Sequence, residues 1–456
     1  MKATMYARLF TAAAVAVCFQ SAGMAQTAKP TVRIMTLDPG HYHAALVQKE
    51  MYDQVDPVVH VYAPPGEDLD LHLQKIDLFN TRPDNPTRWI TKVYTGSDYL
   101  ERMLRDRPGN LVVLAGNKSR TTRYILECVK AGLHVLSDKP MAINPRHYEM
   151  LLEAFKIAEE KNVLLYDIMT ERYEITTIMQ RELSMVPEVF GRLQTGTPDQ
   201  PAVTKESVHH FSKTVAGKPL KRPAWFFDVE QEGEGLNDVG THLADLVQWE
   251  CFPEQILKTD DVKMLSARRW STAIAPEQFK KVTGLDSFPD FLKKDIKEGV
   301  LHVPGNGEMI YTLKGHYAKV SVAWRFEPPP GAEDTHYSIM RGSRANLIIE
   351  QGPRQKYKPV LYVENRSGEP DDVFQQKLEA ALKRINERIP GVTFKKGEGN
   401  WEIVIPDALK TNHEQHFAQV TEKYLSFLAQ GRMPAWEVPN MIVKYYTLME
   451  AYKASR

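Results

Sequence analysis

Short runs of consecutive apolar residues alternate with longer amphipathic stretches over the first third of the chain. The runs at 32–37, 58–63, 111–117 and 134–137 have the length of buried strands, and helical patterns follow near 43, 98, 121 and 144. A long polar stretch with many charges runs to about Arg88. Unbroken apolar strands with helices between them are typical of a sheet covered on both faces. The pattern therefore predicts a doubly wound parallel sheet within residues 26–160.

The pattern changes after residue 163. A short strand at 163–167 leads into a helix, and apolar and polar residues later alternate at 309–313, 318–326, 336–341, 346–350 and 360–364. Alternation with a period of two indicates an antiparallel sheet with one covered face. Helices near 372–388 and 413–429 would cover that face or dock on the first domain. We therefore expect a C-terminal α/β domain with a largely antiparallel open sheet at 161–456.

The first 25 residues have a different character. Lys2 and Arg8 precede the apolar run 9–17, and the small residues Gly23 and Ala25 follow at cleavage-like spacing. This is the pattern of a secretory signal peptide at 1–25, too short for a permanent membrane span. We expect an exported, periplasmic protein without a membrane span.

Charge and cysteine content narrow the class of partner. The chain has 58 basic and 58 acidic residues, and zero net charge disfavours nucleic acid or an anionic membrane as partner. Cys128 and Cys251, the cysteines outside the first 25 residues, form neither a disulfide framework nor a metal knuckle. The expected ligand is a small molecule.

A glycine-rich approach to an apolar run at 233–246 contains the pair Asp238 and His242. Four residues apart, they share one face of a helix. A carboxylate beside an imidazole can fix its tautomer and tune its pKa near neutral pH. The plainer interpretation is a helix cap followed by a core histidine.

Three loops fall at the carboxyl ends of the predicted parallel strands, where such sheets bind ligands: 37–43, 115–118 and 138–140. A dinucleotide site would place G-x-G-x-x-G in the first loop. The equivalent positions here are Met35, Leu37 and Gly40, of which only the last is glycine. The second strand ends in Ala63 without an acidic residue to hold a ribose.

Several of these residues also occur together in a known family. Gly40 with His43 and Ala44, then Asp138-Lys139-Pro140, then Asp238-x-Gly240-x-His242-x-x-Asp245 resemble the Gfo/Idh/MocA oxidoreductases in order and spacing. The resemblance covers nearly the whole chain after the signal peptide and is strongest from about 30 to 250. Residues 207–211 and 222–225 resemble an exported branch with its own C-terminal domain.

The resemblance implies a Rossmann domain that binds NAD, with NADP not excluded, and roles for several residues. Lys139 would contact the nicotinamide ribose and the substrate, and its bond to Pro140 would be cis. His242 would be the acid or base on the reacting hydroxyl, with Asp238 beside it. Asp138 keeps the carboxylate of the family's usual Glu. The expected cofactor contacts are Leu37, Asp38, Gly40, His41, His43, Ala63, Asn117, Asp138 and Lys139.

A substrate pocket is expected from Tyr173, His209, His210, Trp225 and His242, where Trp225 would suit the apolar face of a sugar ring. The alternative is a loop packed for structural reasons. The pairs His41/His43 and His413/His416 raise a metal site as an alternative. Each pair supplies at most half a tetrahedral ligand set, so no metal is expected.

Three functions remain open from the sequence. The first is an exported nicotinamide-dependent oxidoreductase on a secondary hydroxyl of a sugar or glycoside, with a tightly bound, recycled cofactor. The second uses transient oxidation to cleave a glycosidic bond. The third is a carbohydrate-binding relative without cofactor, which the retention of Lys139, Asp238 and His242 disfavours. The family also implies a homo-oligomer formed through the open sheet.

Overall fold

The first sheet is parallel throughout, as the apolar runs predicted. The computed structural model describes residues 31–215 and 218–456, so the predicted signal peptide lies outside the described residues. Six strands take the order β3-β2-β1-β4-β5-β6, and every neighbouring pair is parallel. They are β1 (Ile34–Leu37), β2 (Val58–Ala63), β3 (Ile90–Thr95), β4 (Leu111–Leu114), β5 (His134–Ser137) and β6 (Leu165–Asp167).

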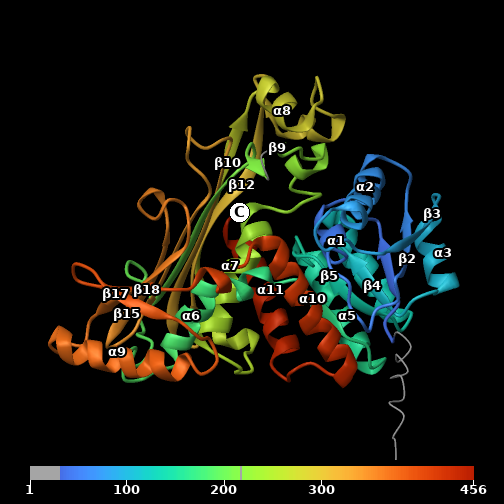
Figure 1. The fold of residues 1–456 in the computed structure, drawn as a ribbon. Coiled ribbons are helices and arrows are strands. Elements are labelled where there is room, and N and C mark those ends of the chain that lie inside the picture. Colours follow the sequence, from blue (N-terminus) through green and yellow to red (C-terminus); the bar gives the residue numbers. More distant parts are fainter. Residues whose placement is uncertain (1–30, 216–217) are drawn as a thin grey trace, which may run out of the picture.

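Helices on both faces complete this Rossmann-like domain (Figure 1). They are α1 (His43–Leu46), α2 (Glu67–Thr81), α3 (Tyr99–Asp106), α4 (Lys118–Lys130) and α5 (Pro145–Glu160). Helix α5 begins as predicted, because the Asn144 side chain accepts a hydrogen bond from the backbone N–H of His147 at 2.9 Å. Helix α2 and edge strand β3 occupy the polar region around Arg88. Both were missed because β3 is largely exposed and α2 buries only four residues.

Strand β6 belongs to this first sheet, in which it pairs with β5. The sheet thus extends past residue 160, where the change of pattern suggested a domain boundary. A three-residue strand followed by a 3-10 helix, η1 (Thr170–Tyr173), carries too little periodicity to be assigned to either sheet from sequence.

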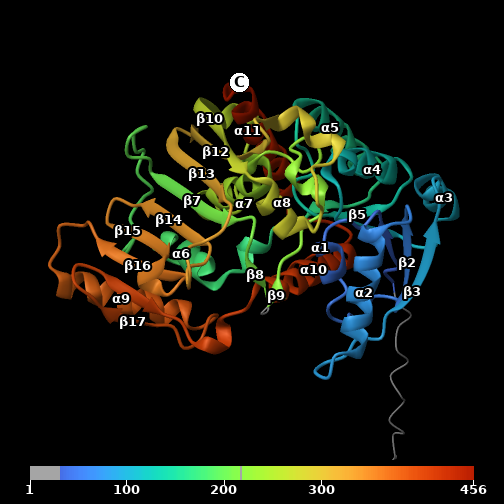
Figure 2. The ribbon, with the colours of Figure 1, turned by 90° about the horizontal axis from the view of Figure 1, so that it is seen from above.

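The second sheet has ten strands and is antiparallel except where β13 pairs with β7. Figure 2 shows it curving beside the first domain. The predicted alternating strands are confirmed, whereas β7, β10 and the short strands are additions. In spatial order they are β10 (Val262–Ile274), β12 (Val300–Leu313), β13 (His316–Arg325), β7 (Val203–His210), β14 (Thr335–Arg341), β15 (Ala345–Gln351), β16 (Val360–Asn365), β18 (Trp401–Val404) and β17 (Thr393–Lys396), with β11 (Ile296–Lys297) beside β12.

Helices cover one face of this sheet and connect it to the first domain. They are α6 (Ile175–Ser184), α7 (Gly235–Cys251), α8 (Pro276–Thr283), α9 (Asp371–Ile385), α10 (His413–Gln430) and α11 (Glu437–Ala454). Helix α10 docks on the first domain, where the Tyr424 hydroxyl donates to the carbonyl oxygens of Val135 and Leu164. The two expected roles, covering and docking, are thus divided between α9 and α10.

Helix α7 is the buried link between the domains (Figure 1). All but two of its 17 residues are buried. Its start lies so close to β12 that a Cβ on Gly235 would be 1.8 Å from the carbonyl oxygen of Gly305. This contact fixes the position from which Asp238 and His242 project.

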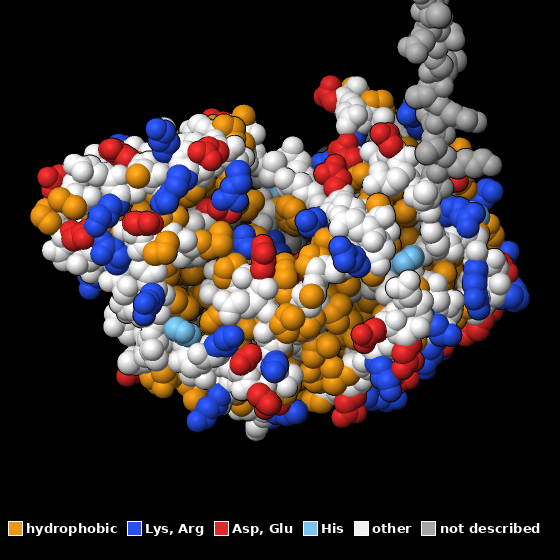
Figure 3. Space-filling model, turned by 90° about the horizontal axis from the view of Figure 1, so that it is seen from below, with side chains coloured by type: hydrophobic (Ala, Val, Ile, Leu, Met, Phe, Trp, Pro, Cys, Tyr) orange, Lys and Arg blue, Asp and Glu red, His pale blue; other side chains and the backbone are white. Residues whose placement is uncertain are grey.

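The surface shows no dominance of one charge. Seen from below, hydrophobic side chains gather along the middle, and acidic and basic side chains are interspersed on the flanks (Figure 3). Among the described residues, no helix combines the length and apolar character needed to cross a bilayer.

Candidate active site

The loops that follow β1 and β4 are joined to each other. The backbone N–H groups of Gly40 and His41 both donate to the carbonyl oxygen of Ala115, at 3.1 and 3.0 Å. A Cβ on Gly116 would lie 2.2 Å from the carbonyl oxygen of Asp38. Only glycine permits so close a backbone approach. The two loops therefore form one packed unit at the carboxyl edge of the sheet.

This unit departs from the usual phosphate-binding loop. The backbone donors of the first loop are used within the protein, and the following helix α1 has only four residues. Leu37 and Ala63 are buried at the ends of their strands. The carboxylate of Asp38 accepts from the Tyr124 hydroxyl at 2.8 Å and pairs with Arg120 at 2.9 Å. The missing glycines thus correspond to a real difference in backbone use.

An acidic residue that the sequence did not reveal lies beside Gly40. Asp68, in the first turn of α2, has a carboxylate oxygen 3.0 Å from the position of a Cβ on Gly40. The same oxygen accepts from the indole N–H of Trp225 at 3.2 Å. Burial raises the pKa of Asp68. A carboxylate therefore lies beside the first loop, five residues after the end of β2.

Asn117 connects the domains. Its side-chain oxygen accepts from the N–H of Ser119 at 3.1 Å and caps α4. Its amide donates to Gln231, which precedes α7, at 2.7 Å. A residue expected at the cofactor is thus committed to the domain junction.

Asp138 is the centre of a buried polar cluster with two of the predicted histidines. One carboxylate oxygen contacts Nζ of Lys118 at 2.9 Å, Nδ1 of His43 at 3.1 Å and Nδ1 of His41 at 3.8 Å. The other oxygen is buried without a hydrogen-bond partner. Burial opposes ionisation, but Lys118 and His43 outweigh it and hold the pKa of Asp138 well below its ordinary value. Burial lowers the pKa of both histidines.

Of the two predicted histidine pairs, His41/His43 stays together, with ring centres 4.0 Å apart, whereas His413/His416 separates. Nε2 of His413 lies 3.4 Å from Nε2 of His43, whereas His416 is buried with an unpartnered Nε2. His41, His43 and Asp138 offer three ligand atoms within 4.8 Å of one another. However, the ammonium group of Lys118 contacts the Asp138 oxygen in that set. The absence of a metal stays a prediction.

Lys139 pairs across the domain boundary with Asp238. Its Nζ lies 2.5 Å from the Asp238 carboxylate and 3.3 Å from the backbone carbonyl oxygen of the same residue. The Lys139–Pro140 bond is cis, as the resemblance implied. Burial lowers the pKa of Lys139, but Asp238 and Asp138 outweigh it, so the pKa lies above its ordinary value. Burial alone would favour the neutral amine, but the pairing keeps Lys139 a cation.

His242 is buried one turn along α7 and has an unpartnered Nδ1. No hydrogen bond joins it to Asp238, so the carboxylate–imidazole pair suggested by their spacing is not formed. The reason is that Lys139 takes the carboxylate. Burial, followed by Lys139 and His413, lowers the pKa of His242 well below its ordinary value. The imidazole is therefore neutral at neutral pH, and its burial opposes protonation.

Two glutamates join this site without any sequence motif. Burial, reinforced by Asp238, raises the pKa of Glu232 to about 8, and one of its carboxylate oxygens is unpartnered. Burial and Glu174 raise the pKa of Glu171 to about 7. Nothing local distinguishes them from surface glutamates, because tertiary packing creates their environment.

The substrate candidates form two groups. His209 and His210 both contact Asp334, at 3.3 and 2.8 Å. Trp225 lies towards the first domain through its bond to Asp68.

The fourth substrate candidate, Tyr173, ends η1 and belongs to a different side of the site. Burial raises the pKa of its hydroxyl to about 12. Its neighbour Arg172 is bonded to Asp245 of α7 at 2.6 and 2.7 Å. Lys444 of α11 holds Asp245 and Asp167 at 3.0 and 2.7 Å. This network of buried charges fixes the position of α7.

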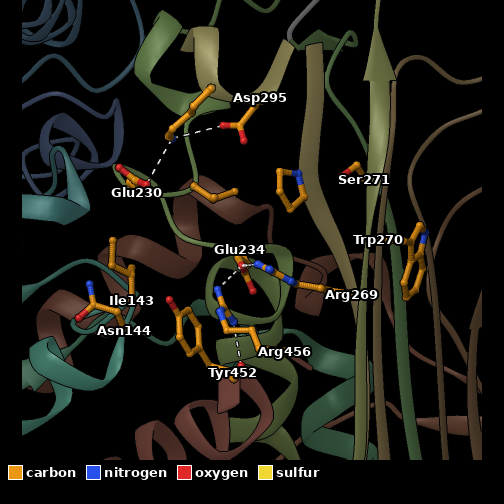
Figure 4. Close-up of a pocket in the computed structure, with 13 residues that line it drawn as sticks. Ile143, Asn144, Glu230, Glu234, Arg269, Trp270, Ser271, Asp295, Tyr452 and Arg456 are labelled. Atoms are coloured by element: carbon orange, nitrogen blue, oxygen red, sulfur yellow. Dashed lines mark hydrogen bonds and ion pairs between the residues drawn. The ribbon is translucent and has the colours of Figure 1, made fainter. Parts of the chain in front are cut away.

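A separate cavity of about 640 Å³ lies beside the start of α7 (Figure 4). Glu234 is held there by Arg269 and by Arg456, the latter at 2.7 Å. This cavity is lined by none of the predicted site residues. Its lining consists of Ile143, Asn144, Val229, Glu230, Glu234, Arg269, Trp270, Ser271, Lys294, Asp295, Pro304, Tyr452 and Arg456.

Comparison with known proteins agrees with this architecture. Residues 42–167 match the family model described as "Oxidoreductase family, NAD-binding Rossmann fold", and residues 179–456 match "Putative oxidoreductase C terminal domain". The chain belongs to the Gfo/Idh/MocA oxidoreductases. A crystal structure of a "putative oxidoreductase" from Parabacteroides merdae is 52% identical, with a TM-score of 0.92, over 94% of this chain and 98% of that chain.

More distant members of this fold carry named activities. GenD2 from gentamicin A biosynthesis, in complex with NAD, is 13% identical with a TM-score of 0.55, over 94% of this chain and 95% of that chain. KijD10, a 3-ketoreductase from Actinomadura kijaniata in complex with NADP and TDP-benzene, is 13% identical with a TM-score of 0.54, over 93% and 98%. No curated protein matches the chain.

Proposed function

We propose that this Gfo/Idh/MocA protein is an exported oxidoreductase that transfers a hydride between a nicotinamide cofactor and a secondary hydroxyl of a sugar or glycoside. The observation that carries the proposal is the Lys139–Asp238 pair, at 2.5 Å, beside a neutral His242 at the carboxyl edge of the first sheet. Such a buried cation and neutral base provide the two functions that alcohol oxidation requires.

The residues fit the cofactor better at one end than at the other. Lys139, Asp138 and Asp68 provide polar side chains at the strand ends, and Asp68 suits a ribose hydroxyl. The amides of Gly40 and His41 are engaged with Ala115, so the pyrophosphate would need other donors. When bound, the nicotinamide supplies the acceptor or donor of hydride.

The protein side chains carry the proton and the charge. In oxidation, the His242 imidazole accepts the hydroxyl proton while Lys139 donates a hydrogen bond to the same oxygen and stabilises its developing negative charge. Asp238 keeps Lys139 oriented and protonated. In reduction the proton returns from His242 to the new hydroxyl. The carbohydrate class is supported by the 3-ketoreductase activity named for a protein of the same fold.

Two alternative functions make different predictions. An NAD-dependent glycosidase would use the same proton transfers in a transient oxidation. A carbohydrate-binding relative without cofactor is favoured by the engaged amides of the first loop. Product analysis separates the first from our proposal: a persistent keto-sugar indicates net oxidation, and a released sugar without net redox change indicates cleavage.

The test begins with mature protein purified without added cofactor. Denaturation followed by mass spectrometry of the released molecules, with absorbance near ~340 nm beforehand, should reveal NAD or NADH. Titration with NAD and NADP is the second arm. If the protein neither releases nor binds a nicotinamide nucleotide, the oxidoreductase proposal is contradicted, and the carbohydrate-binding function without cofactor is the one that is left.

Export and assembly are separate proposals. We propose cleavage after Ala25, and the N-terminal sequence of protein from the periplasmic fraction tests it. We also propose a homo-oligomer through the open face of the second sheet. Sedimentation of the purified protein tests this, and a monomer at all concentrations would contradict it.

A further inference from the structure

Arg222 holds its guanidinium group in a fixed plane beside the proposed active site. The group lies 4.4 Å from the ring centre of Phe226 and 5.1 Å from that of Trp324. Its Nε donates to the carbonyl oxygen of Phe211 at 2.8 Å, and Nη2 donates to that of His210 at 3.2 Å. Within the described residues, Nη1 has no hydrogen-bond partner.

This arginine differs from the other cations around the site. Lys139 pairs with Asp238, Lys118 with Asp138, and Lys213 with Asp334. In the part of the chain that the structure describes, no carboxylate lies within ion-pair distance of Arg222. Arg222 is only partly buried, so its guanidinium group can be reached by a bound anion.

The position of Arg222 places it on the catalytic side of the site. Arg222 Nη2 is bonded to the carbonyl oxygen of His210, and Trp225, three residues further along the chain, donates to Asp68 of the first domain at 3.2 Å. The segment that carries Arg222 therefore runs from the second sheet to the first domain, and Arg222 lies at the junction of the two domains. Its bonds to two backbone carbonyls explain how its loop is anchored, but they leave the Nη1 donors unused.

We infer that Arg222 binds an oxyanion substituent of the sugar, so that the substrate is an acidic rather than a neutral carbohydrate. The inference rests on the proposed function. A guanidinium group offers parallel N–H donors that match carboxylate, sulfate or phosphate oxygens in a two-bond geometry. The rings of Phe226 and Trp324 hold its plane in advance, which reduces the entropy lost on binding.

The experiment uses mature enzyme with the cofactor it retains. Methyl glucoside, methyl glucuronide and methyl glucoside 6-sulfate, each in both anomeric forms, form a matched set that differs at one carbon. We expect a higher kcat/KM for at least one acidic sugar than for glucoside, and Arg222→Gln should lower it about 100-fold. Arg222→Lys keeps the charge and should recover part of it. Arg268→Gln, on exposed strand β10, is the control and should change nothing.

The outcomes are distinct. The subsite is supported if Arg222→Gln lowers kcat/KM for the acidic sugar and retains turnover of the glucoside. The preference for the glucuronide or the 6-sulfate then identifies the anionic group that the subsite binds. Preference for the neutral glucoside, or an equal loss for all sugars, overturns it. If no sugar reacts, the proposed function has failed. Calorimetric binding of the same sugars then tests Arg222 alone: equal binding of acidic and neutral forms overturns the subsite.

Discussion

The loops after β1 and β5 lie at the same edge of the first sheet, yet they use their polar groups in opposite ways. After β1, the amides of Gly40 and His41 donate to Ala115, which belongs to the same domain. After β5, Lys139 reaches Asp238 of α7, and the backbone N–H of Met141 donates to the Tyr445 hydroxyl at 3.0 Å. The first loop closes on its own domain, and the second crosses to the other.

This difference separates binding from chemistry. A loop with satisfied amides offers few fixed donors to a pyrophosphate, whereas a loop whose side chains cross the junction places charge where a substrate would lie. Retention of a cofactor would therefore depend on side chains such as Asp68 and Lys139 more than on glycine amides. The predictions below perturb these two loops or the segments packed beside the first of them.

The largest effect is expected from the crossing loop. Lys139→Met should lower kcat/KM at least about 1,000-fold, because it removes the donor that stabilises the developing oxyanion. It should also lower the free energy of unfolding by about 3 kcal/mol, because Asp238 is left buried and unpaired. Turnover and urea unfolding measure the two effects.

A double variant separates these effects. Lys139→Met with Asp238→Asn should recover much of the stability but none of the activity. Lys130→Met, on the exposed side of α4, is the matched control and should change neither quantity. Recovery of activity in the double variant would show that Lys139 acts only structurally.

A methyl group should destabilise the protein more at Gly116, in the loop after β4, than at Gly40, in the loop after β1 that packs against it. Gly116→Ala places a Cβ 2.2 Å from a backbone carbonyl oxygen and should cost about 3 kcal/mol of unfolding free energy. Gly40→Ala meets only the end of the Asp68 side chain, at 3.0 Å, and should cost about 1 kcal/mol. Urea unfolding of both variants makes the comparison, and equal costs would contradict it.

The same contrast explains what the sequence could predict. Strands β2 and β5 were predicted with their observed ends, because a short apolar-rich segment that ends at a proline-containing turn can be recognised without tertiary information. Edge strand β3 is exposed along most of its length and carries no such pattern. Helix α2 has many charges on its exposed face, which concealed the few residues it buries.

The sequence predicted which residues belong to the candidate site better than it predicted which of them pair with each other. Lys139, Asp238 and His242 lie together as expected, but the partner of Asp238 is Lys139, 99 positions away, rather than the local His242. Asp68 and Glu232 carry no motif, and Arg222 lies in the segment 222–225 but received no role from it. Their roles depend on which side chains tertiary folding places opposite them, and such contacts leave no local pattern.

The next largest effect is expected on stability at acid pH, from a buried histidine of the first domain. His43 has Asp138 at 3.1 Å, which opposes the effect of burial on its pKa, whereas both ring nitrogens of His72 are unpartnered. Burial lowers the pKa of His72 from 6.5 to about 4. The unfolded state therefore binds more protons below pH ~6.5, and stability falls as the pH decreases towards ~4.

At pH ~5, the lowered pKa of His72 should reduce the free energy of unfolding by about 2 kcal/mol relative to pH ~8. His72→Leu keeps an apolar side chain in its place and should remove that part of the acid sensitivity. Urea unfolding at pH ~8 and ~5 measures the change for both proteins. An unchanged loss of stability in the variant would show that other groups cause it.

The smallest effect concerns the carboxylate that substitutes for the missing acid of β2. Asp68→Asn keeps the size of the side chain and its acceptor oxygen but removes the charge. If Asp68 holds a ribose hydroxyl, affinity for the nicotinamide cofactor should fall about tenfold, as expected for a hydrogen bond to a charged acceptor.

Trp225→Phe removes the other donor to Asp68 and leaves the carboxylate in place. It should leave affinity unchanged or raise it, because the oxygen becomes free for the ribose. Fluorescence titration of cofactor-depleted protein measures both affinities. Equal losses in the two variants would instead show that the Trp225–Asp68 bond matters for holding the domains together, and the first loop would then contribute to the site only through its shape.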